Sequence, residues 1–170
     1  MNHSKQHELE RIIADFDTAM LVTFSLAGAP RGRPMAIAGT GKDGELYFTT
    51  RSEDEKLGEI LRSPDVAVTM QAVDRYVSLT GKARLETDVQ LAEKLWSPAM
   101  RVWFPDGFKG SQFTLIRVDP VYAEFWDRRG LRKLEYLWEA GKALAAHRKA
   151  EDDELSGHAK LKMRQDGERQ

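Results

Sequence analysis

The feature that most constrains the fold is a series of short extended segments joined by turns in the first third of the chain. Ala19–Ser25, Arg31–Ala38 and Glu45–Thr50 are rich in apolar, β-branched and aromatic residues, and the turn signals Ala27–Pro30 and Gly39–Gly44 separate them. Turns this short leave no room for the crossover helix that joins parallel strands. The three segments are therefore predicted to form an antiparallel meander.

The rest of the chain adds further strands and only short helices. Strands are predicted over Val66–Gln71, Tyr76–Leu85 and Phe113–Trp126, the last interrupted at Pro120. Helical spacing predicts four helices: His7–Phe16, a segment that opens with the capping box Ser52–Glu55 and ends at Ser63-Pro64, Asp88–Leu95, and Leu131–Leu144. Since most strands have no helix between them, we expect a mainly β fold with flanking helices, a six-stranded antiparallel split β-barrel.

Composition and charge limit the class of protein. The chain has 170 residues, enough for one domain, and 41% of them are hydrophobic, as in a folded soluble protein. The formal net charge of -1 argues against a dedicated nucleic-acid binder, and the apolar stretches are too short to span a membrane. The absence of cysteine excludes disulfides and thiolate metal sites. We expect one cytoplasmic domain over residues 1–150 and a mobile charged tail over residues 151–170.

Two patterns that look like functional motifs have simpler interpretations. Residues 39–44 have the G-x-G-x-x-G spacing of a dinucleotide-binding loop, but strands flank them on both sides, so a hairpin loop with Gly44 at positive φ is predicted. His3 and His7 have i,i+4 spacing, but without a partner carboxylate at a defined place they indicate a solvated helix start. No metal site is expected.

A set of cationic and hydroxyl side chains has the chemistry of a phosphate site. Arg33 lies on the second predicted strand, and Thr49, Thr50, Ser52 and Lys56 lie where the third strand passes into a helix. A strand end followed by a helix N-terminus offers hydroxyls, backbone N–H groups and a favourable dipole together. The alternatives from the residues alone are a capping role for Ser52 and solvated positions for Arg33 and Lys56.

Large aromatic residues are concentrated in the C-terminal half of the chain. Trp96, Trp103, Phe104 and Trp126 are suited to core or interface positions. Trp103 and Phe104 lie in a predicted loop, where side chains of this size need a partner surface. A homodimer interface would supply that surface.

Five segments in a fixed order connect the chain with a known family: Arg33–Met35, Leu46–Thr50 with Lys56, Tyr76–Ala83, Trp103–Gly107 and Ala123–Asp127. In this order they resemble the FMN-binding split-barrel superfamily of pyridoxamine 5′-phosphate oxidase, most closely its general stress protein branch. The resemblance extends over residues 8–127. It implies a homodimer with FMN at the subunit interface. FAD or another flavin is an alternative cofactor, as is a deazaflavin. Haem is a further alternative, but it matches less well because the predicted strands contain no histidine.

The resemblance also assigns cofactor-binding residues. The full set is Arg33, Pro34, Met35, Phe48, Thr49, Thr50, Ser52, Lys56, Trp103, Phe104 and Trp126. Within it, Arg33 would contact the flavin and its phosphate, whereas Thr49, Thr50 and Lys56 would hold the phosphate. Trp126 would reach the flavin of the partner subunit.

Departures from the family pattern bear on the reaction. The oxidase has a lysine five residues after the strand arginine, where this chain has Ala38, and a histidine and second arginine that are missing from Arg132–Tyr136. Each lost charged hydrogen bond weakens binding by about 1.5–3 kcal/mol, so oxidation of pyridoxamine phosphate is not expected. The resemblance implies an FMN-dependent oxidoreductase acting on an unidentified small molecule, or a flavin-binding stress or redox-sensing module with little turnover.

Alternation along the last strand predicts which residues face the core. Val121 and Phe125 share one face of the strand and suit the barrel interior. Trp126 lies on the opposite face, so it is predicted to point outward. Across a dimer interface it would cover the flavin of the partner subunit.

Overall fold

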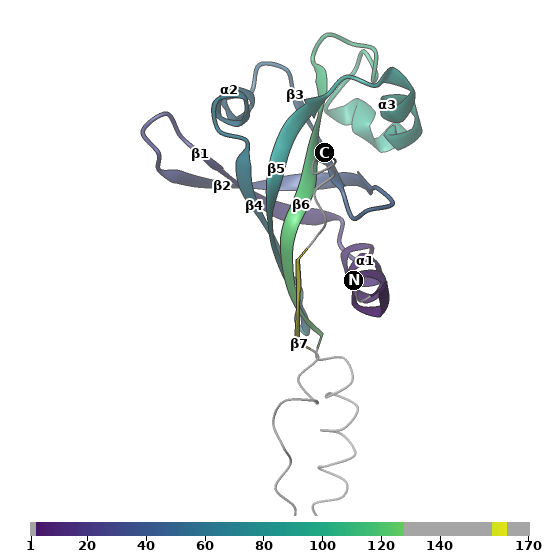
Figure 1. Ribbon diagram of the computed structural model, residues 1–170. Helices are drawn as coiled ribbons and strands as arrows, with labels where there is room; N and C mark the ends of the chain where they lie inside the picture. The colour runs from purple at the N-terminus through teal and green to yellow at the C-terminus, as the bar shows by residue number, and fades with distance from the viewer. Residues whose placement is uncertain (1–2, 128–157, 163–170) are drawn as a thin grey trace, which may run out of the picture.

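The computed structural model describes residues 3–127 and 158–162 (Figure 1). The elements in chain order are α1 (His3–Ile13), β1 (Thr18–Phe24), β2 (Pro30–Thr40), β3 (Leu46–Arg51), α2 (Glu55–Arg62), β4 (Asp65–Gln71), β5 (Arg75–Glu86), α3 (Val89–Leu95), the 3₁₀-helix η1 (Pro98–Val102), β6 (Phe113–Asp127) and β7 (His158–Lys162). Within the described residues, no helix is both long enough and apolar enough to cross a membrane.

The sheet closes on itself as an antiparallel barrel. The strands follow the order β3-β2-β1-β4-β5-β6, and β3 pairs with β6 to complete the ring. This is possible because β6, with 15 residues, pairs with β5 along nearly its whole length and still offers its other edge to β3 in its first half and to β7 in its second. The predicted six-stranded antiparallel barrel is confirmed.

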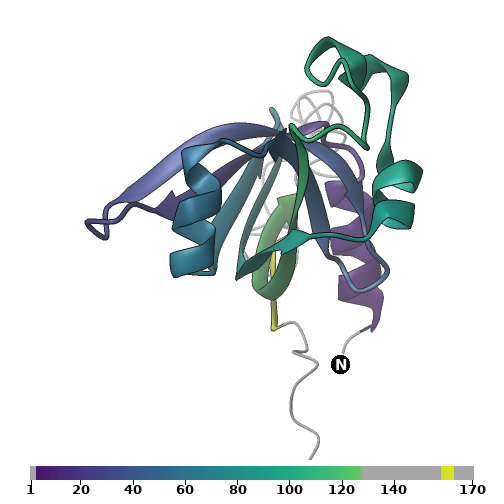
Figure 2. The same cartoon turned by 90° about the horizontal axis from the view of Figure 1, so that it is seen from above.

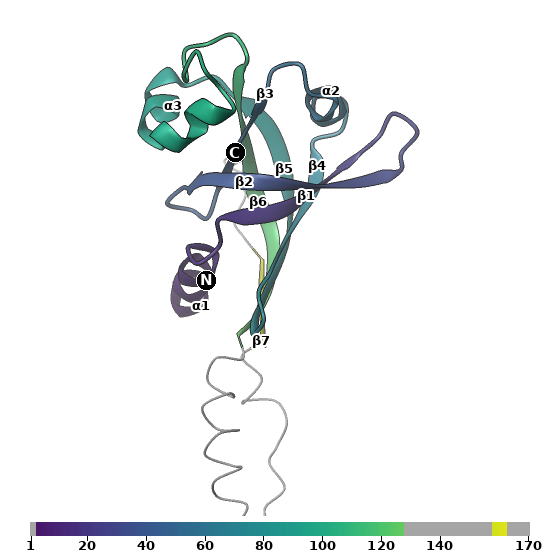
Figure 3. The ribbon, with the colours of Figure 1, turned by 180° about the vertical axis from the view of Figure 1, so that it is seen from behind.

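The barrel interior and two of the helices form one hydrophobic core. Alternate strand residues such as Leu21, Phe48 and Phe125 fill the interior, and Ile12 of α1 and Ile60 of α2 join the same cluster. Opposite views show α1 and α3 on one side of the barrel and α2 on the other (Figures 1 and 3). The helix α2 packs Leu57 and Ile60 on the core, and its polar residues Lys56 and Glu59 are buried as well.

The strand β6 is continuous through Pro120, where an interruption was predicted. Its register with β5 shifts, so that Gly81 opposes Pro120 while Thr80 opposes Tyr122. Val121 is the extra residue on β6 and forms a bulge.

The bulge reverses the alternation of side chains along β6. Val118 is buried before the bulge and Phe125 after it, although they are seven positions apart, an odd offset that would put them on opposite faces of a regular strand. Val121 itself is only partly buried, so its predicted place in the core is wrong. Phe125 faces the interior and Trp126 the opposite side, as predicted.

The C-terminal region is described only in part. The helix predicted over Leu131–Leu144 lies outside the described residues, as does most of the segment 151–170 expected to be a mobile charged tail. Within that segment, His158–Lys162 forms β7 and pairs with β6 from Tyr122 to Trp126. This pairing is possible because β6 offers an edge of backbone hydrogen-bonding groups, which composition does not reveal.

The close backbone contact at the β6 bulge predicts that two glycine substitutions change the free energy of unfolding in opposite directions. A Cβ at Gly81 would lie 2.3 Å from the backbone oxygen of Asp119, whereas a Cβ at Gly58 of α2 meets nothing within 4 Å. Gly81→Ala should lower the free energy of unfolding by about 2 kcal/mol or more. Gly58→Ala should raise it by up to about 1 kcal/mol, because alanine favours the helix. Urea denaturation measures both, and equal stability of the two variants would contradict the bulge geometry.

Candidate functional site

The strands β2 and β3 pair over only a short stretch and then diverge. Ile37–Thr40 pairs with Leu46–Phe48. Beyond this point, Pro30–Ala36 of β2 is laddered to β1, while Thr49–Arg51 of β3 is laddered to β6. We call the opening between these two segments, together with α2 that follows β3, the β2–β3 split. Each segment has a ladder on one side within the described residues, so each turns a backbone edge toward the split.

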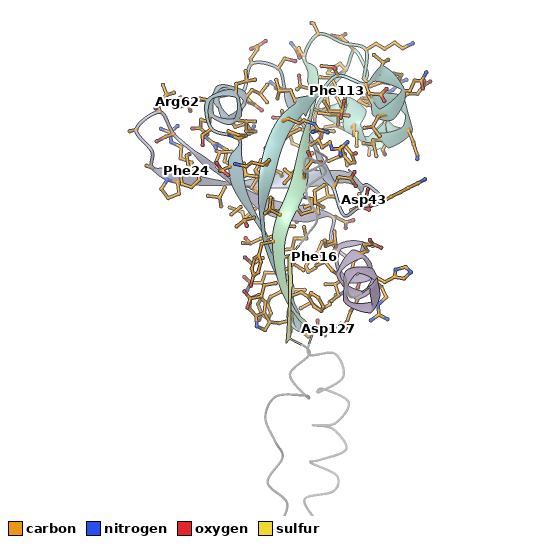
Figure 4. The ribbon with its side chains drawn as sticks, in the orientation of Figure 1. Phe16, Phe24, Asp43, Arg62, Phe113 and Asp127 are labelled. Carbon is orange, nitrogen blue, oxygen red and sulfur yellow. The ribbon has the colours of Figure 1, made fainter. Side chains whose placement is uncertain are left out.

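The β1–β2 hairpin and α2 form one side of the molecule. From above, the hairpin extends away from the barrel beside α2 (Figure 2). Phe24 at the end of β1 and Arg62 at the end of α2 lie on this side, away from Asp43 in the β2–β3 turn (Figure 4). That turn is a hairpin loop with Gly44 at φ 85°, as predicted.

A buried lysine lies at the start of α2. Lys56 is 8% exposed, and its Nζ donates to Thr50 Oγ1 at 2.8 Å and to Asp54 Oδ2 at 2.6 Å. The Thr50 hydroxyl also donates to Asp54 Oδ2. Partial burial acts to raise the pKa of Asp54, but the hydrogen bonds from Lys56 and Thr50 outweigh it and hold the pKa below its ordinary value. Asp54 is therefore a carboxylate at neutral pH.

Ser52 does not cap the helix. The N-cap residue of α2 is Asp54, and Ser52 Oγ instead donates to the Ser111 backbone oxygen at 2.8 Å and lies 2.7 Å from Thr114 Oγ1. The Ser52 N–H donates to the Gln112 backbone oxygen, which keeps the chain extended past β3. The predicted capping box is wrong, because pairing with the segment before β6 delays the helix.

A second polar cluster joins α2 to the β1–β2 hairpin. Glu59, 2% exposed, accepts from the Thr23 hydroxyl at 2.5 Å, from both terminal nitrogens of Arg33 at 2.9 and 3.2 Å, and from Arg31 at 3.2 Å. Arg31 also donates to Glu55 at 2.6 Å. The hydrogen bond from Arg33 is the main reason that the pKa of Glu59 lies below its ordinary value. Glu59 is thus a buried, ionised carboxylate.

Sequence reasoning missed Thr23 and Glu59. The signal was present in part, because Arg31 and Arg33 alternate on one face of a strand and Glu55 and Glu59 are four residues apart on one face of a helix. Only the fold places those two faces against each other. The guanidinium of Arg33, which the resemblance assigns to the flavin, is bound by Glu59.

The other predicted site residues divide into three groups. Thr49 is half-buried beside Thr50 at the split. Met35 and Phe48 pack in the core, so only their backbone is available to a ligand. Pro34 lies in the part of β2 laddered to β1 alone, where a missing N–H is tolerated on the open edge.

The aromatic residues predicted at the site lie in different parts of the subunit. Phe104 is buried and packs edge-on against Phe113 with ring centroids 5.1 Å apart, whereas Trp103 is 65% exposed. Thr50 opposes Thr114 near the start of β6, while Trp126 lies near its end. The chain alone therefore joins Lys56 to Thr50 and Arg33 to Glu59 of the same helix, with Thr49 next to Thr50 on β3, and it places Trp126 at the other end of β6.

The sequence of the chain matches a known protein family over most of its length. Residues 4–151 match the model of the family described as pyridoxamine 5′-phosphate oxidase like. The chain belongs to this family.

Relatives within this group are similar in sequence and in fold. General stress protein 26 of Bacillus subtilis (strain 168) is 30% identical over 98 residues, which cover 55% of this chain and 68% of that protein. The crystal structure of a general stress protein 26 candidate from Jannaschia sp. CCS1 has a TM-score of 0.75 at 18% identity, covering 95% of this chain and 99% of the other. That of the general stress FMN/FAD binding protein from Xanthomonas citri has a TM-score of 0.65 at 20% identity, covering 88% and 98%.

The Glu59 cluster predicts how stability depends on pH. Because the pKa of Glu59 in the folded protein lies below its ordinary value of 4.5, the ionised group adds stability above about pH 4.5, and this is lost as the pH falls through the folded-state pKa. Glu59→Gln should cost about 3 kcal/mol of unfolding free energy at pH 7, since it leaves the partly buried guanidinium of Arg33 without its counter-ion, whereas Arg31 keeps Glu55. The difference in unfolding free energy between Glu59→Gln and wild type should become smaller below about pH 4.

Urea denaturation at a series of pH values measures this effect. Glu53→Gln, on the exposed stretch before α2, removes the same charge and should change stability by less than about 0.5 kcal/mol. A Glu59→Gln deficit that stays constant from pH 7 to pH 3 would show that ionisation of Glu59 is not what stabilises the cluster.

Proposed function

We propose that the protein binds FMN in the β2–β3 split, with the phosphate at Lys56 and Thr50, and that it acts as a homodimeric FMN-dependent oxidoreductase on a small molecule. The observation that carries the proposal is the buried ammonium of Lys56 beside a threonine hydroxyl at the start of a helix. The counter-ion of this ammonium is the partly exposed carboxylate of Asp54, and a phosphate is an anion that the same donors can also bind.

The donors at the split match the needs of a phosphate group. Lys56 provides charge, Thr50 and Thr49 provide hydroxyls, and the start of α2 adds N–H groups and the positive end of its dipole. The strand edges of the split offer further backbone groups to the rest of the cofactor. When bound, the isoalloxazine ring would supply exchange of electrons with a substrate. The chain's own part is to hold the phosphate, orient the ring and exclude water.

Two features of the chain narrow the proposed reaction. Ala38 provides no cation where the true oxidase has a lysine, so pyridoxamine phosphate is not the proposed substrate. The carboxylates at the split, Asp54, Glu55 and Glu59, are all in ion pairs, which argues against a general base among them. The pairing of all three carboxylates favours the alternative of a flavin-binding redox sensor with little turnover.

An apolar outer face on β1 and β2 supports the homodimer. Met20, Val22 and Phe24 point away from the core on β1, and their partners on β2 are Pro34, Gly32 and Pro30 in that order. Met20 is 40% exposed. An exposed apolar face on a strand pair favours a second surface that covers it. A second copy of the chain would also bring its Trp126 toward the split, which Trp126 does not reach within one subunit.

Flavin titration tests the proposed function. Protein purified without cofactor should bind FMN with a shift in flavin absorbance and fluorescence, and bound FMN should raise the melting temperature. Reduction by NADH or NADPH, followed by reoxidation with a defined electron acceptor, would identify an enzyme. Bound flavin that stays oxidised with both donors would favour the sensor, and failure to bind any flavin would exclude both.

Lys56 predicts a difference between two flavins. Lys56→Ala should weaken FMN binding about tenfold or more, because a charged hydrogen bond to phosphate is lost, and should leave riboflavin binding nearly unchanged. Lys82→Ala is the matched control, since Lys82 pairs with Asp65 on the exposed β4–β5 surface. Equal losses for FMN and riboflavin would mean that the phosphate lies elsewhere.

The outer face predicts the behaviour of a charged variant. Met20→Glu should weaken dimerisation about tenfold or more, because the carboxylate would be buried without a partner, and FMN binding should weaken with it. Leu61→Glu places the same charge on the exposed side of α2 and should leave the dimer intact. Analytical ultracentrifugation measures both variants. A Met20→Glu protein that stays dimeric and binds FMN would place the interface on another surface.

A further inference from the structure

The cations at the split have counter-ions from one short part of the chain. Lys56 pairs with Asp54, Arg31 with Glu55, and Arg33 with Glu59. These carboxylates belong to α2 or to its N-cap residue. A phosphate that binds at the split therefore enters a site whose positive charge is already balanced, and it must take the place of a carboxylate.

Glu59 is not suited to be displaced. Its side chain is 2% exposed and is held by Thr23, Arg31 and Arg33. Turning it away would break all of these hydrogen bonds and leave a charge buried in the core, which is a large penalty. The Glu59 cluster is a fixed part of the fold.

Asp54 is placed differently. Its side chain is 37% exposed and makes no capping hydrogen bond to α2. It accepts from Lys56 at 2.6 Å, from the Thr50 hydroxyl and from the Arg51 N–H at 3.2 Å. Rotation about its side-chain bonds would move the carboxylate into water, where it is well solvated, and would free the ammonium and the hydroxyl together.

We propose that Asp54 is the residue that sets the preference between phosphorylated and unphosphorylated flavins. This rests on the proposed function. The carboxylate of Asp54 occupies the Lys56 and Thr50 donors that the FMN phosphate needs, so binding of the phosphate requires its displacement. A flavin without a phosphate leaves the Asp54–Lys56 pair undisturbed. The affinity for FMN is thereby held down, and FMN is an exchangeable ligand rather than a permanently bound group.

Removal of the negative charge at residue 54 tests the proposal. Asp54→Asn keeps the size of the side chain and its ability to serve as N-cap. It should tighten FMN binding about tenfold, equivalent to about 1.4 kcal/mol, and slow the release of FMN, while riboflavin affinity stays unchanged. Asp54→Ser, which has the same capping ability, should give the same change and guards against an effect peculiar to asparagine. Fluorescence titration and stopped-flow release measure these quantities.

Asp65→Asn is the matched control. Asp65 forms a 2.5 Å ion pair with Lys82 on the exposed surface, so this variant changes net charge equally without touching the split. It should bind both flavins as wild type does. Unchanged or weaker FMN binding in both folded Asp54 variants, with wild type still binding FMN, would overturn the role of Asp54 and leave the proposed function standing. If wild type binds neither flavin, the proposed function and this inference both fail.

Discussion

A buried ion pair joins α2 to β2 across the split, and the geometry of the candidate site depends on it. Glu59 receives two hydrogen bonds from Arg33 and one from Thr23, at the side of the barrel where β2 no longer pairs with β3. Lys56 lies three residues earlier on the same helix. The pair that holds α2 against the hairpin therefore also fixes where Lys56 meets Thr50. Breaking such a pair is strongly destabilising, so the site has a rigid support.

The ion pairs Glu59–Arg33 and Lys56–Asp54 have different roles, one in the fold and one in the proposed binding of a ligand. Buried Glu59 and Arg33 satisfy each other and leave little for a ligand, whereas Lys56 has a counter-ion that faces water. The Glu59–Arg33 pair stabilises the fold, whereas Lys56 can exchange the Asp54 carboxylate for another anion. The apolar face on β1 and β2 is consistent with the proposed second subunit, and Trp126, which is expected to cover the flavin of a partner, lies far along β6 from Thr50.

The sequence predicts the barrel well because its evidence is local. Short turns between β1, β2 and β3 exclude parallel strands, and the alternation around Phe125 and Trp126 correctly assigns the core face of β6. The nearness of Thr50 to Lys56 follows from the passage of a strand into a helix.

The rest depends on contacts between distant segments. The bulge at Val121 arises from the register with β5, and Ser52 bonds to Ser111 and Thr114 rather than to its own helix. Glu59 meets Arg33 only because the barrel closes. In each case the deciding partner is remote in sequence, so no local pattern could identify it.

A crystal structure of the dimer with FMN bound would test most directly whether Lys56 and Thr50 hold the phosphate. We expect the phosphate within hydrogen-bond distance of Lys56 Nζ and Thr50 Oγ1, the Asp54 carboxylate turned into solvent, and the Glu59–Arg33 pair unchanged. A phosphate bound elsewhere, with the Lys56–Asp54 ion pair intact, would contradict this expectation.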